Sequence, residues 1–318
     1  MKGAYLIDIH NISPSIEVVS NAHFENLGFD LRSPLPSTLT YANSLYFLRR
    51  GLDAEQITAI MTSRNIYENY MAKYDGAITK GLSISDNPVK DFFLFHNFLA
   101  KNSQIYDRDV QTRIGSNCTI SKLASISTEN VVIGDRVVIE DFVRINSNVT
   151  IGSDSVVCAG SIIGNDGFQF MQLTGTVLRV EHVGGVRIGR NVEIQSNCCV
   201  DRHIFNDDTT IGDDTKFDSF VHLAHGSKVG QRCRIAAHAM IAGSTIIGDD
   251  VWIGPSAAIS SAITIGDRAS ITIGAVVIAD VGIGQCVTGN FAIEHRKFLR
   301  YFKGLSGNSA SGTCDTEN

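Results

Sequence analysis

The chain has 318 residues, 43% of them hydrophobic and 19% charged, which is enough apolar surface for a sizeable core in about two domains. Its formal net charge is −6 and no basic stripe runs along it, so a phosphodiester backbone finds no attractive surface and nucleic-acid binding is not expected. Seven cysteines without a CxxC pair indicate free thiols in a reducing cytoplasm. No apolar run is long enough to span a membrane, and Asp8 and His10 come too early for a signal peptide.

Residues 1–105 show no internal repeat and are predicted to form a small α/β domain. Two helices are expected, over Ser63–Lys73 and Val89–Ala100, the second with Pro88 in its first turn and one of the two preceding residues as its N-cap. Short strands are expected at Ala4–Ile7, Thr58–Thr62 and Ala77–Thr79.

Residues 106–290 carry a six-residue repeat. From Ile211 to Ile283 every sixth residue is aliphatic or phenylalanine, at thirteen consecutive positions. This period fits neither an α-helix nor a hairpin meander, but it fits a triangular coil in which each of three sides takes one hexad. The aliphatic residues would point inward and stack on their equivalents one coil away, while glycine and small residues turn the corners. The fold class is therefore predicted as mainly β, a parallel β-helix of about nine coils.

Two breaks in the repeat mark segments that leave the predicted β-helix. Ile188 falls one position later than the register that Ile163 sets, and the second break lies between Val200 and Ile211. Loops that leave a rigid scaffold often carry binding or catalytic residues. After the last coil, residues 291–303 are predicted to form a short basic C-terminal helix, and the polar stretch 304–318 a disordered tail.

Several motifs follow one another in a fixed order along the repeat. They are Gly164–Phe170, His182–Gly185, Val192–Asn197, Val200–Arg202, His222–His225 and Ile241–Ser244. In this order they resemble the UDP-3-O-acylglucosamine N-acyltransferases of lipid A synthesis and, equally, relatives that N-acylate other nucleotide-linked amino sugars. The resemblance implies a left-handed β-helix, a homotrimer, and acyl-CoA or acyl carrier protein as the co-substrate, with no bound cofactor.

The N-terminal segment Leu39–Tyr46 resembles the uridine-binding segment of the same family. The resemblance implies that Tyr41, Asn43 and Tyr46 contact the nucleotide. Asn43 and Tyr46 match the family in spacing, whereas Tyr41 does not occupy the usual position of the aromatic ring.

Two departures from the lipid A enzymes stand out. Ala262 occupies the position where those enzymes usually carry a second histidine, and their longer helical extension is replaced by one short helix. Both differences favour another sugar and a shorter acyl group. We therefore predict an N-acyltransferase that acts on a nucleotide-linked amino sugar in surface-polysaccharide biosynthesis, with the lipid A enzyme itself as the alternative.

N-acylation requires a base for the amine proton and a donor for the oxyanion. The resemblance implies that His225 is the general base; the alternative is that His225 is only a solvated surface histidine. Gly243 follows it by three hexads, which is one complete coil, and its N–H is predicted to face the oxyanion unless it is only a corner glycine. Asp218, seven positions before His225, could orient the imidazole or be a solvated corner residue.

Further contacts are predicted with each substrate. Sugar contacts are expected from Asp166, Phe168, Glu193 and Asp201, for which packing or turn-forming roles are the alternative. Donor contacts are expected from His238, Gly243 and Ser261, and for His222 and His238 the alternative is a surface or trimer contact.

A metal is not expected. The H-x₄-H spacing of hexapeptide carbonic anhydrases is absent, and so is a P-loop or a GxGxxG motif after a strand. A non-enzymatic binding module or a metal-dependent anhydrase on the same scaffold are the competing functional classes.

Overall fold

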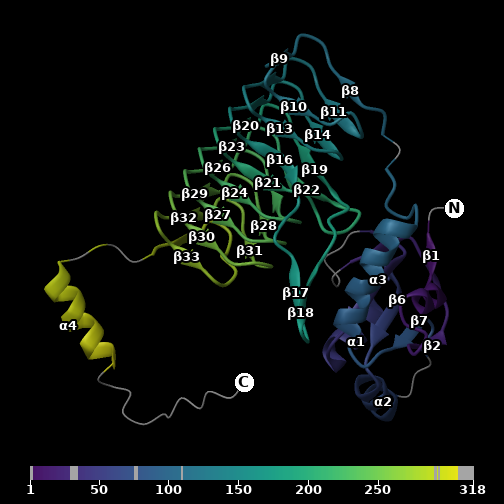
Figure 1. Ribbon diagram of the computed structural model, residues 1–318. Helices are drawn as coiled ribbons and strands as arrows, with labels where there is room; N and C mark the ends of the chain where they lie inside the picture. The colour runs from purple at the N-terminus through teal and green to yellow at the C-terminus, as the bar shows by residue number, and fades with distance from the viewer. Residues whose placement is uncertain are drawn as a thin grey trace.

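The computed structural model describes residues 3–28, 35–74, 78–108, 110–289, 292 and 294–306. A small N-terminal α/β domain lies beside a β-helix, and helix α4 (His295–Ser306) lies beyond the last coil (Figure 1). The predicted fold class is confirmed. Among the residues described, none of the helices combines the length and the apolar character that crossing a bilayer requires.

The β-helix is a three-sided prism of parallel strands, whose sides are called here face 1, face 2 and face 3 in the order in which the chain runs through each coil. Face 1 consists of β8 (Arg113–Ile114), β11 (Val131–Ile133), β14 (Val149–Ile151), β19 (Gly185–Ile188), β22 (Asp208–Ile211), β25 (Lys228–Val229), β28 (Ile246–Ile247) and β31 (Thr264–Ile265). Face 2 consists of β9 (Thr119–Ile120), β12 (Val138–Ile139), β15 (Val156–Val157), β20 (Glu193–Ile194), β23 (Lys216–Phe217), β26 (Arg234–Ile235), β29 (Trp252–Ile253), β32 (Ser270–Ile271) and β34 (Cys286–Val287). Face 3 consists of β10 (Ser125–Ile126), β13 (Arg144–Ile145), β16 (Ile162–Asn165), β21 (Cys199–Asp201), β24 (His222–Leu223), β27 (Met240–Ile241), β30 (Ala258–Ile259) and β33 (Val276–Val277).

From Val131 to Val277 the hexad determines which side chain of each strand is buried. The predicted inward position Ile283 is wrong: it is 68% exposed, because the last turn is shorter and places Val281 beside Ile265 instead. Ile235, Ile253 and Ile271 are register partners on successive coils, and all three are almost fully buried in one continuous core. The residue before each of them points outward. At the corners the chain turns through residues with positive φ, such as His238 (61°) and Asp250 (61°). The repeat therefore leaves outward strand residues and corner residues available for function.

Both breaks in the repeat leave the prism along the same edge, where face 3 gives way to face 1; this edge is called here the 3/1 edge. The first excursion contains the antiparallel hairpin β17 (Phe170–Leu173) and β18 (Thr176–Arg179), which reaches toward the N-terminal domain (Figure 1). Val180 from the first excursion and Phe205 from the second are buried in the same apolar cluster as Phe92 and Phe95 of the N-terminal domain. Burying such a side chain stabilises the folded state by about 1.5–3 kcal/mol, so the excursions attach the two domains to each other.

The N-terminal domain has a five-stranded sheet in the order β2-β7-β6-β5-β4. Its strands are β2 (Glu17–Ser20), β4 (Asn26–Leu27), β5 (Thr38–Ala42), β6 (Ile57–Thr62) and β7 (Gly81–Ile84), and β1 (Ala4–Tyr5) pairs separately with β3 (His23–Phe24). Its helices are α1 (Leu45–Asp53), α2 (Arg64–Lys73), α3 (Pro88–Asn102) and the 3-10 turn η1 (Leu6–Asn11).

Several predictions for this domain are confirmed and others are wrong. The helices expected near Ser63–Lys73 and Val89–Ala100 exist, and the side chains of Ser63 and Asn87 cap them. The strand expected at Thr58–Thr62 exists as β6. The strand expected at Ala4–Ile7 ends at Tyr5, because η1 begins at Leu6.

Three further predictions concern the domain's next strand and the end of the chain. The strand expected at Ala77–Thr79 is wrong for residues 78–79, because β7 begins only at Gly81, and residue 77 lies outside the described residues. Helix α4 begins at His295 rather than at residue 291 and continues to residue 306. The remainder of the predicted tail, residues 307–318, lies outside the described residues.

His96 on α3 ties the N-terminal domain to the first excursion. Its Nε2 donates to the carbonyl oxygen of Glu181 at 2.9 Å, so its Nδ1 accepts from the Tyr106 hydroxyl at 2.8 Å. The neighbouring Asn97 adds hydrogen bonds to the carbonyl of Arg179 and the N–H of Glu181, at 2.7 and 3.0 Å. Complete burial lowers the pKa of His96 to about 4, so the ring is neutral at neutral pH.

We expect His96 to make the stability of the protein sensitive to acid. The unfolded chain binds a proton at the ordinary pKa of 6.5, whereas the folded chain does not until about pH 4. Stability is therefore unaffected above about pH 6.5 and falls as the pH drops from there toward 4. Between pH 7 and pH 5 the titration of His96 lowers the free energy of unfolding by about 2 kcal/mol. Urea unfolding at both pH values should show this loss in the wild-type protein and a smaller loss in His96→Gln; equal losses would contradict the assignment.

Candidate functional site

A cavity of about 790 Å³ lies between the N-terminal domain and the 3/1 edge of the prism. Its lining comes from three parts of the chain that are far apart in sequence. The N-terminal domain supplies Gly28, Tyr41, Asn43 and Phe47; the excursions supply Phe168, Gln169, Asp201, His203, Phe205 and Asp207; the coils supply His222, Ala224, His225, Gly226, Lys228, Met240, Ala242, Gly243, Ser244, Ile246, Ser261 and Ala262.

His225 lies at the turn that follows β24, and its ring lies against the backbone of Gly243 on the next coil. A methyl group added to Gly243 would lie 2.5 Å from His225 Cε1, so only glycine leaves room for the ring. The one-coil spacing predicts this stacking, and the structure shows it. Ser261, one further coil along the chain, lines the same cavity. The predicted base and the predicted oxyanion donor therefore meet, with one predicted donor contact beside them.

The surroundings of His225 keep its imidazole neutral. Burial lowers its pKa to about 4; the nearby His182 and His222 add to this shift, and Asp201 opposes it. The ring of His182 packs edge-on against it, with 5.7 Å between the centroids. Within the described part of the chain, neither ring nitrogen of His225 has a hydrogen-bond partner, and the Gly243 N–H donates to no acceptor. Both groups are therefore available to a ligand.

Asp218 does not orient His225, so this prediction is wrong. It lies at the turn after β23, on the edge between faces 2 and 3, because a spacing of seven corresponds to slightly more than one side of the triangle. Its carboxylate accepts hydrogen bonds from the backbone N–H groups of Ser219 and Ala237, at 2.7 and 3.2 Å. Asp218 holds two turns of its own edge together.

His238 and Glu193 also lie away from the cavity within this chain. His238 is on the same edge as Asp218, and its ring stacks on Phe220 with 4.9 Å between the centroids. Glu193 is on face 2 and accepts a hydrogen bond from the side chain of Gln195. The donor contact predicted for His238 and the sugar contact predicted for Glu193 are therefore not part of this cavity, because neither position falls on the 3/1 edge.

Asp201 lines the cavity as predicted, although it is only 2% exposed. It accepts a hydrogen bond from Nε2 of His222 at 2.9 Å, and this bond is the main reason why the pKa of His222 is raised. Asp166 does not line the cavity. Its carboxylate pairs with Arg179 at 2.7 Å and Arg202 at 3.5 Å, so it holds the base of the first excursion in place.

Among the predicted nucleotide contacts, Tyr41 and Asn43 line the cavity and Tyr46 does not. Tyr41 packs edge-on against Phe92, with 5.1 Å between the ring centroids. Tyr46 is 62% exposed, and its hydroxyl accepts a hydrogen bond from Arg50 at 3.1 Å. The next residue of helix α1, Phe47, faces the cavity instead, because successive helical residues point about 100° apart.

Phe168, a predicted sugar contact, lies on the cavity wall as expected and is 85% exposed. Its ring is 4.8 Å from that of Phe170, centroid to centroid. Gly167, just before it, brings the loop against the histidines: a methyl group there would lie 3.0 Å from His225 Cδ2 and 3.1 Å from His182 Nε2. The first excursion therefore covers the imidazole pair with backbone and offers one exposed aromatic ring to a ligand.

Several residues of the site, among them His203 and Lys228, carry no motif that predicts a role. His203 lies over Gly226, accepts a hydrogen bond from the N–H of Phe205 at 3.0 Å, and has its pKa lowered by burial to about 4. Lys228 pairs with Asp207 at 2.8 Å. Their positions in the sequence could have indicated a role: His203 and Asp207 lie within the second break in the repeat, and Lys228 lies one coil after it.

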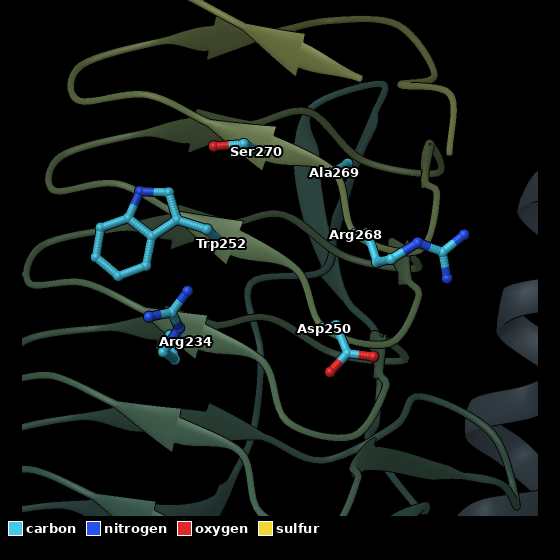
Figure 2. A pocket seen from close by; sticks show the side chains of 6 residues that line it. All are labelled: Arg234, Asp250, Trp252, Arg268, Ala269 and Ser270. Atoms are coloured by element: carbon cyan, nitrogen blue, oxygen red, sulfur yellow. The ribbon is translucent and has the colours of Figure 1, made fainter. Parts of the chain in front are cut away.

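A second, shallower hollow lies on face 2 and its adjoining edge (Figure 2). Arg234 lies over the ring of Trp252 at 5.3 Å, and Asp250 is already bound by Arg232 at 2.7 and 2.8 Å. Its remaining lining residues are Arg268, Ala269 and Ser270. It contains no histidine or thiol, so the cavity at the 3/1 edge is the better candidate for chemistry.

Known proteins resemble parts of this chain. The family described as "Bacterial transferase hexapeptide (six repeats)" matches residues 130–165 and 208–243, which confirms the predicted repeat. A "UDP-3-O-acylglucosamine N-acyltransferase" from Delftia acidovorans is 34% identical over 136 residues, 43% of this chain and 40% of the relative. Proteins of the same name from Caulobacter sp. and Rickettsia prowazekii are 36% and 44% identical, over 46% and 30% of this chain and 43% and 27% of their own length. The predicted resemblance to these enzymes is confirmed.

The extent of these matches is limited. The chain spans about two fifths of the length of the curated relatives that it matches. Among solved structures, a "UDP-N-acetylglucosamine acyltransferase from Campylobacter jejuni" is 17% identical with a TM-score of 0.42, over 61% of this chain and 86% of that one.

The stacking of His225 on Gly243 gives a structural prediction. In Gly243→Ala the new methyl group should push the imidazole away from the backbone toward the cavity. Because the ring is then less buried, the pKa of His225 should rise from about 4 toward its ordinary 6.5. Histidine NMR titration would measure the change. Gly282→Ala is the control, because its nearest neighbour would be a side-chain oxygen at 3.4 Å; an unchanged His225 pKa in Gly243→Ala would contradict the packing.

Proposed function

We propose that this protein is an N-acyltransferase that moves an acyl group from a thioester to the amine of a nucleotide-linked amino sugar. One observation carries the proposal: a neutral imidazole lies against an unused backbone N–H inside a large cavity between two domains. The relatives named UDP-3-O-acylglucosamine N-acyltransferase support the same chemistry.

In the proposed reaction the amine nitrogen attacks the thioester carbonyl carbon. His225 accepts the proton that the amine loses, and the Gly243 N–H donates to the oxyanion of the tetrahedral intermediate. Collapse of this intermediate breaks the carbon–sulfur bond, and the proton on His225 passes to the departing thiolate. The products are an amide and a free thiol. No metal takes part in these steps, and no bound cofactor is required.

The cavity supports separate positions for the two parts of the acceptor. Tyr41, Asn43 and Phe47 offer aromatic surface and an amide to a nucleotide base. Asp201, which lies beside the same Gly167 backbone as His225, and the exposed Phe168 offer a carboxylate and a ring to the sugar. Ser261 and the open side of Gly243 are left for the acyl donor, either acyl-CoA or an acyl carrier protein.

The acceptor proposed first is UDP-3-O-acylglucosamine, because the relatives carry this name. The second candidate is another nucleotide-linked amino sugar of surface-polysaccharide biosynthesis. Ala262 supports it, because the cavity has a methyl group at this position rather than an imidazole. We further propose that the protein acts in the cytoplasm as a homotrimer.

The acceptor can be tested directly by mass spectrometry of reaction products. UDP-3-O-acylglucosamine and a panel of UDP- and dTDP-linked amino sugars would each be combined with acetyl-CoA, 3-hydroxybutyryl-CoA and long-chain 3-hydroxyacyl carrier protein. We expect one acceptor to gain the mass of an acyl group. Absence of transfer to any amino sugar would overturn the proposed function.

His225→Ala should lose most of the turnover, because general base catalysis contributes roughly 10²–10⁴-fold to the rate. The matched control is His10→Ala, which removes an exposed histidine that does not line the cavity and should keep turnover within a few-fold of the wild type. Circular dichroism would show that both variants fold. Wild-type turnover in His225→Ala would refute the mechanism.

Asn43→Ala should raise KM for the nucleotide sugar while leaving kcat nearly unchanged. Loss of one hydrogen bond worth about 0.5–1.5 kcal/mol corresponds to roughly a 2–12-fold increase. Tyr46→Phe, which removes only the contact with Arg50, is the control and should leave KM unchanged. The nucleotide assignment fails if both variants behave alike in steady-state kinetics.

A further inference from the structure

Three side chains with metal-ligating atoms meet on the outer side of face 3. Cys199 on β21 and His222 on β24 are register partners on successive coils. Their neighbours Val200 and Leu223 point into the core and are fully buried, so Cys199 and His222 point outward together. Asp201 lies two positions after Cys199, on the same outward side, and is almost fully buried.

The distances between the three groups are close to those of a four-coordinate zinc site. Cys199 Sγ is 3.4 Å from Asp201 Oδ1, and His222 Nε2 is 2.9 Å from Asp201 Oδ2. One ligand atom from each residue lies within 4.8 Å of the others. Zinc bonds of about 2.3 Å to sulfur and about 2.0 Å to nitrogen or oxygen place tetrahedral ligand atoms roughly 3.3–3.6 Å apart. The three ligand atoms are therefore near the separations that one ion requires.

The ligand types and their surroundings select the class of metal. A thiolate, an imidazole and a carboxylate are a set suited to zinc and cobalt, whereas magnesium and calcium prefer oxygen ligands. Three protein ligands leave a fourth position open, and because Asp201 and His222 both line the cavity, that position faces it.

A second observation concerns the ring of His182, which lies beside Asp201. His182 is only 7% exposed, and its Nε2 has no hydrogen-bond partner. A methyl group added to Gly167 would lie 3.1 Å from this nitrogen and 3.2 Å from Asp201 Oδ2, so both atoms face the same spot. A water molecule bound to a metal at Asp201 would give this nitrogen a partner.

We propose that Cys199, Asp201 and His222 form a binding site for one zinc-class divalent ion. Binding replaces the thiol proton of Cys199 and the His222–Asp201 hydrogen bond with three metal–ligand bonds, and the released proton passes to solvent. The fourth coordination position opens into the cavity and takes a water molecule that His182 can hydrogen-bond. The site shares Asp201 with the proposed sugar contacts, so a bound ion would compete with that contact, although the proposed acyl transfer itself needs no metal.

Cobalt(II) is the probe, because tetrahedral Co²⁺ with a thiolate ligand has strong visible bands and a sulfur-to-metal charge-transfer band. The full-length, metal-stripped protein would be titrated with CoCl₂, and zinc binding would be measured by calorimetry at the same pH. We expect one ion per chain, both sets of bands, and displacement of cobalt by zinc. If the wild-type protein shows neither these bands nor binding of one ion per chain, the proposal is overturned.

Variants separate this site from adventitious binding to other thiols. Cys199→Ser should abolish the charge-transfer band and weaken zinc binding at least about tenfold, and His222→Ala should weaken it similarly. Cys286→Ser removes an exposed thiol on face 2 and should leave spectrum and affinity unchanged. A charge-transfer band that persists in Cys199→Ser, or is lost in Cys286→Ser, would refute the site. Because the readout is spectroscopic, it remains valid even if no acyl transfer is detected.

Discussion

Register-locked stacking of aliphatic side chains is the interaction on which the rest of the structure depends. Each inward residue, such as Ile235, packs on its equivalents one coil above and below, and backbone hydrogen bonds join the same coils. A coil alone buries little, so the prism is stable only as a stack. Once the stack exists, positions three hexads apart are held at one strand spacing. This constraint brings His225 and Gly243 together.

Because the stack is rigid, the two excursions that interrupt it are held in fixed positions beside the N-terminal domain. Both excursions leave from the 3/1 edge, and their apolar residues pack with Phe92 and Phe95 of the N-terminal domain. The cavity is the space that this attachment leaves above the turns of the edge. A single apolar cluster thus fixes the position of the nucleotide-binding candidates Tyr41 and Asn43 relative to His225. Changes to the cluster should alter the cavity before they alter the prism.

Burial gives the cavity its chemical character. His225 and His203 are kept neutral because desolvation disfavours the charged imidazole. His222, in contrast, has its pKa raised by Asp201. The histidines that line this one cavity therefore have pKa values shifted in opposite directions. A neutral ring can accept a proton from a substrate amine, and the Asp201–His222 pair offers ligand atoms to a cation.

The sequence by itself determined the prism, its phase from Ile211 to Val277 and the two interruptions, because the six-residue period follows the sides of the triangular coil; the phase failed only at its last predicted position, Ile283. It therefore predicted that Gly243 stacks on His225. It did not determine which edge a residue occupies when the spacing is not a whole number of coils. Asp218 was placed wrongly for this reason, and His238 and Glu193 lie outside the cavity of this chain.

Only the tertiary structure decided which side chains of the N-terminal domain and the excursions face the cavity. Phe47 replaces Tyr46 because helix α1 turns one residue and not its neighbour toward the prism. Likewise, His182 meets His225 and Asp201 only through the fold of the first excursion. Contacts between coils recur at a fixed spacing in the sequence, so they can be predicted by counting residues. Contacts between irregular segments depend on packing that no repeat encodes.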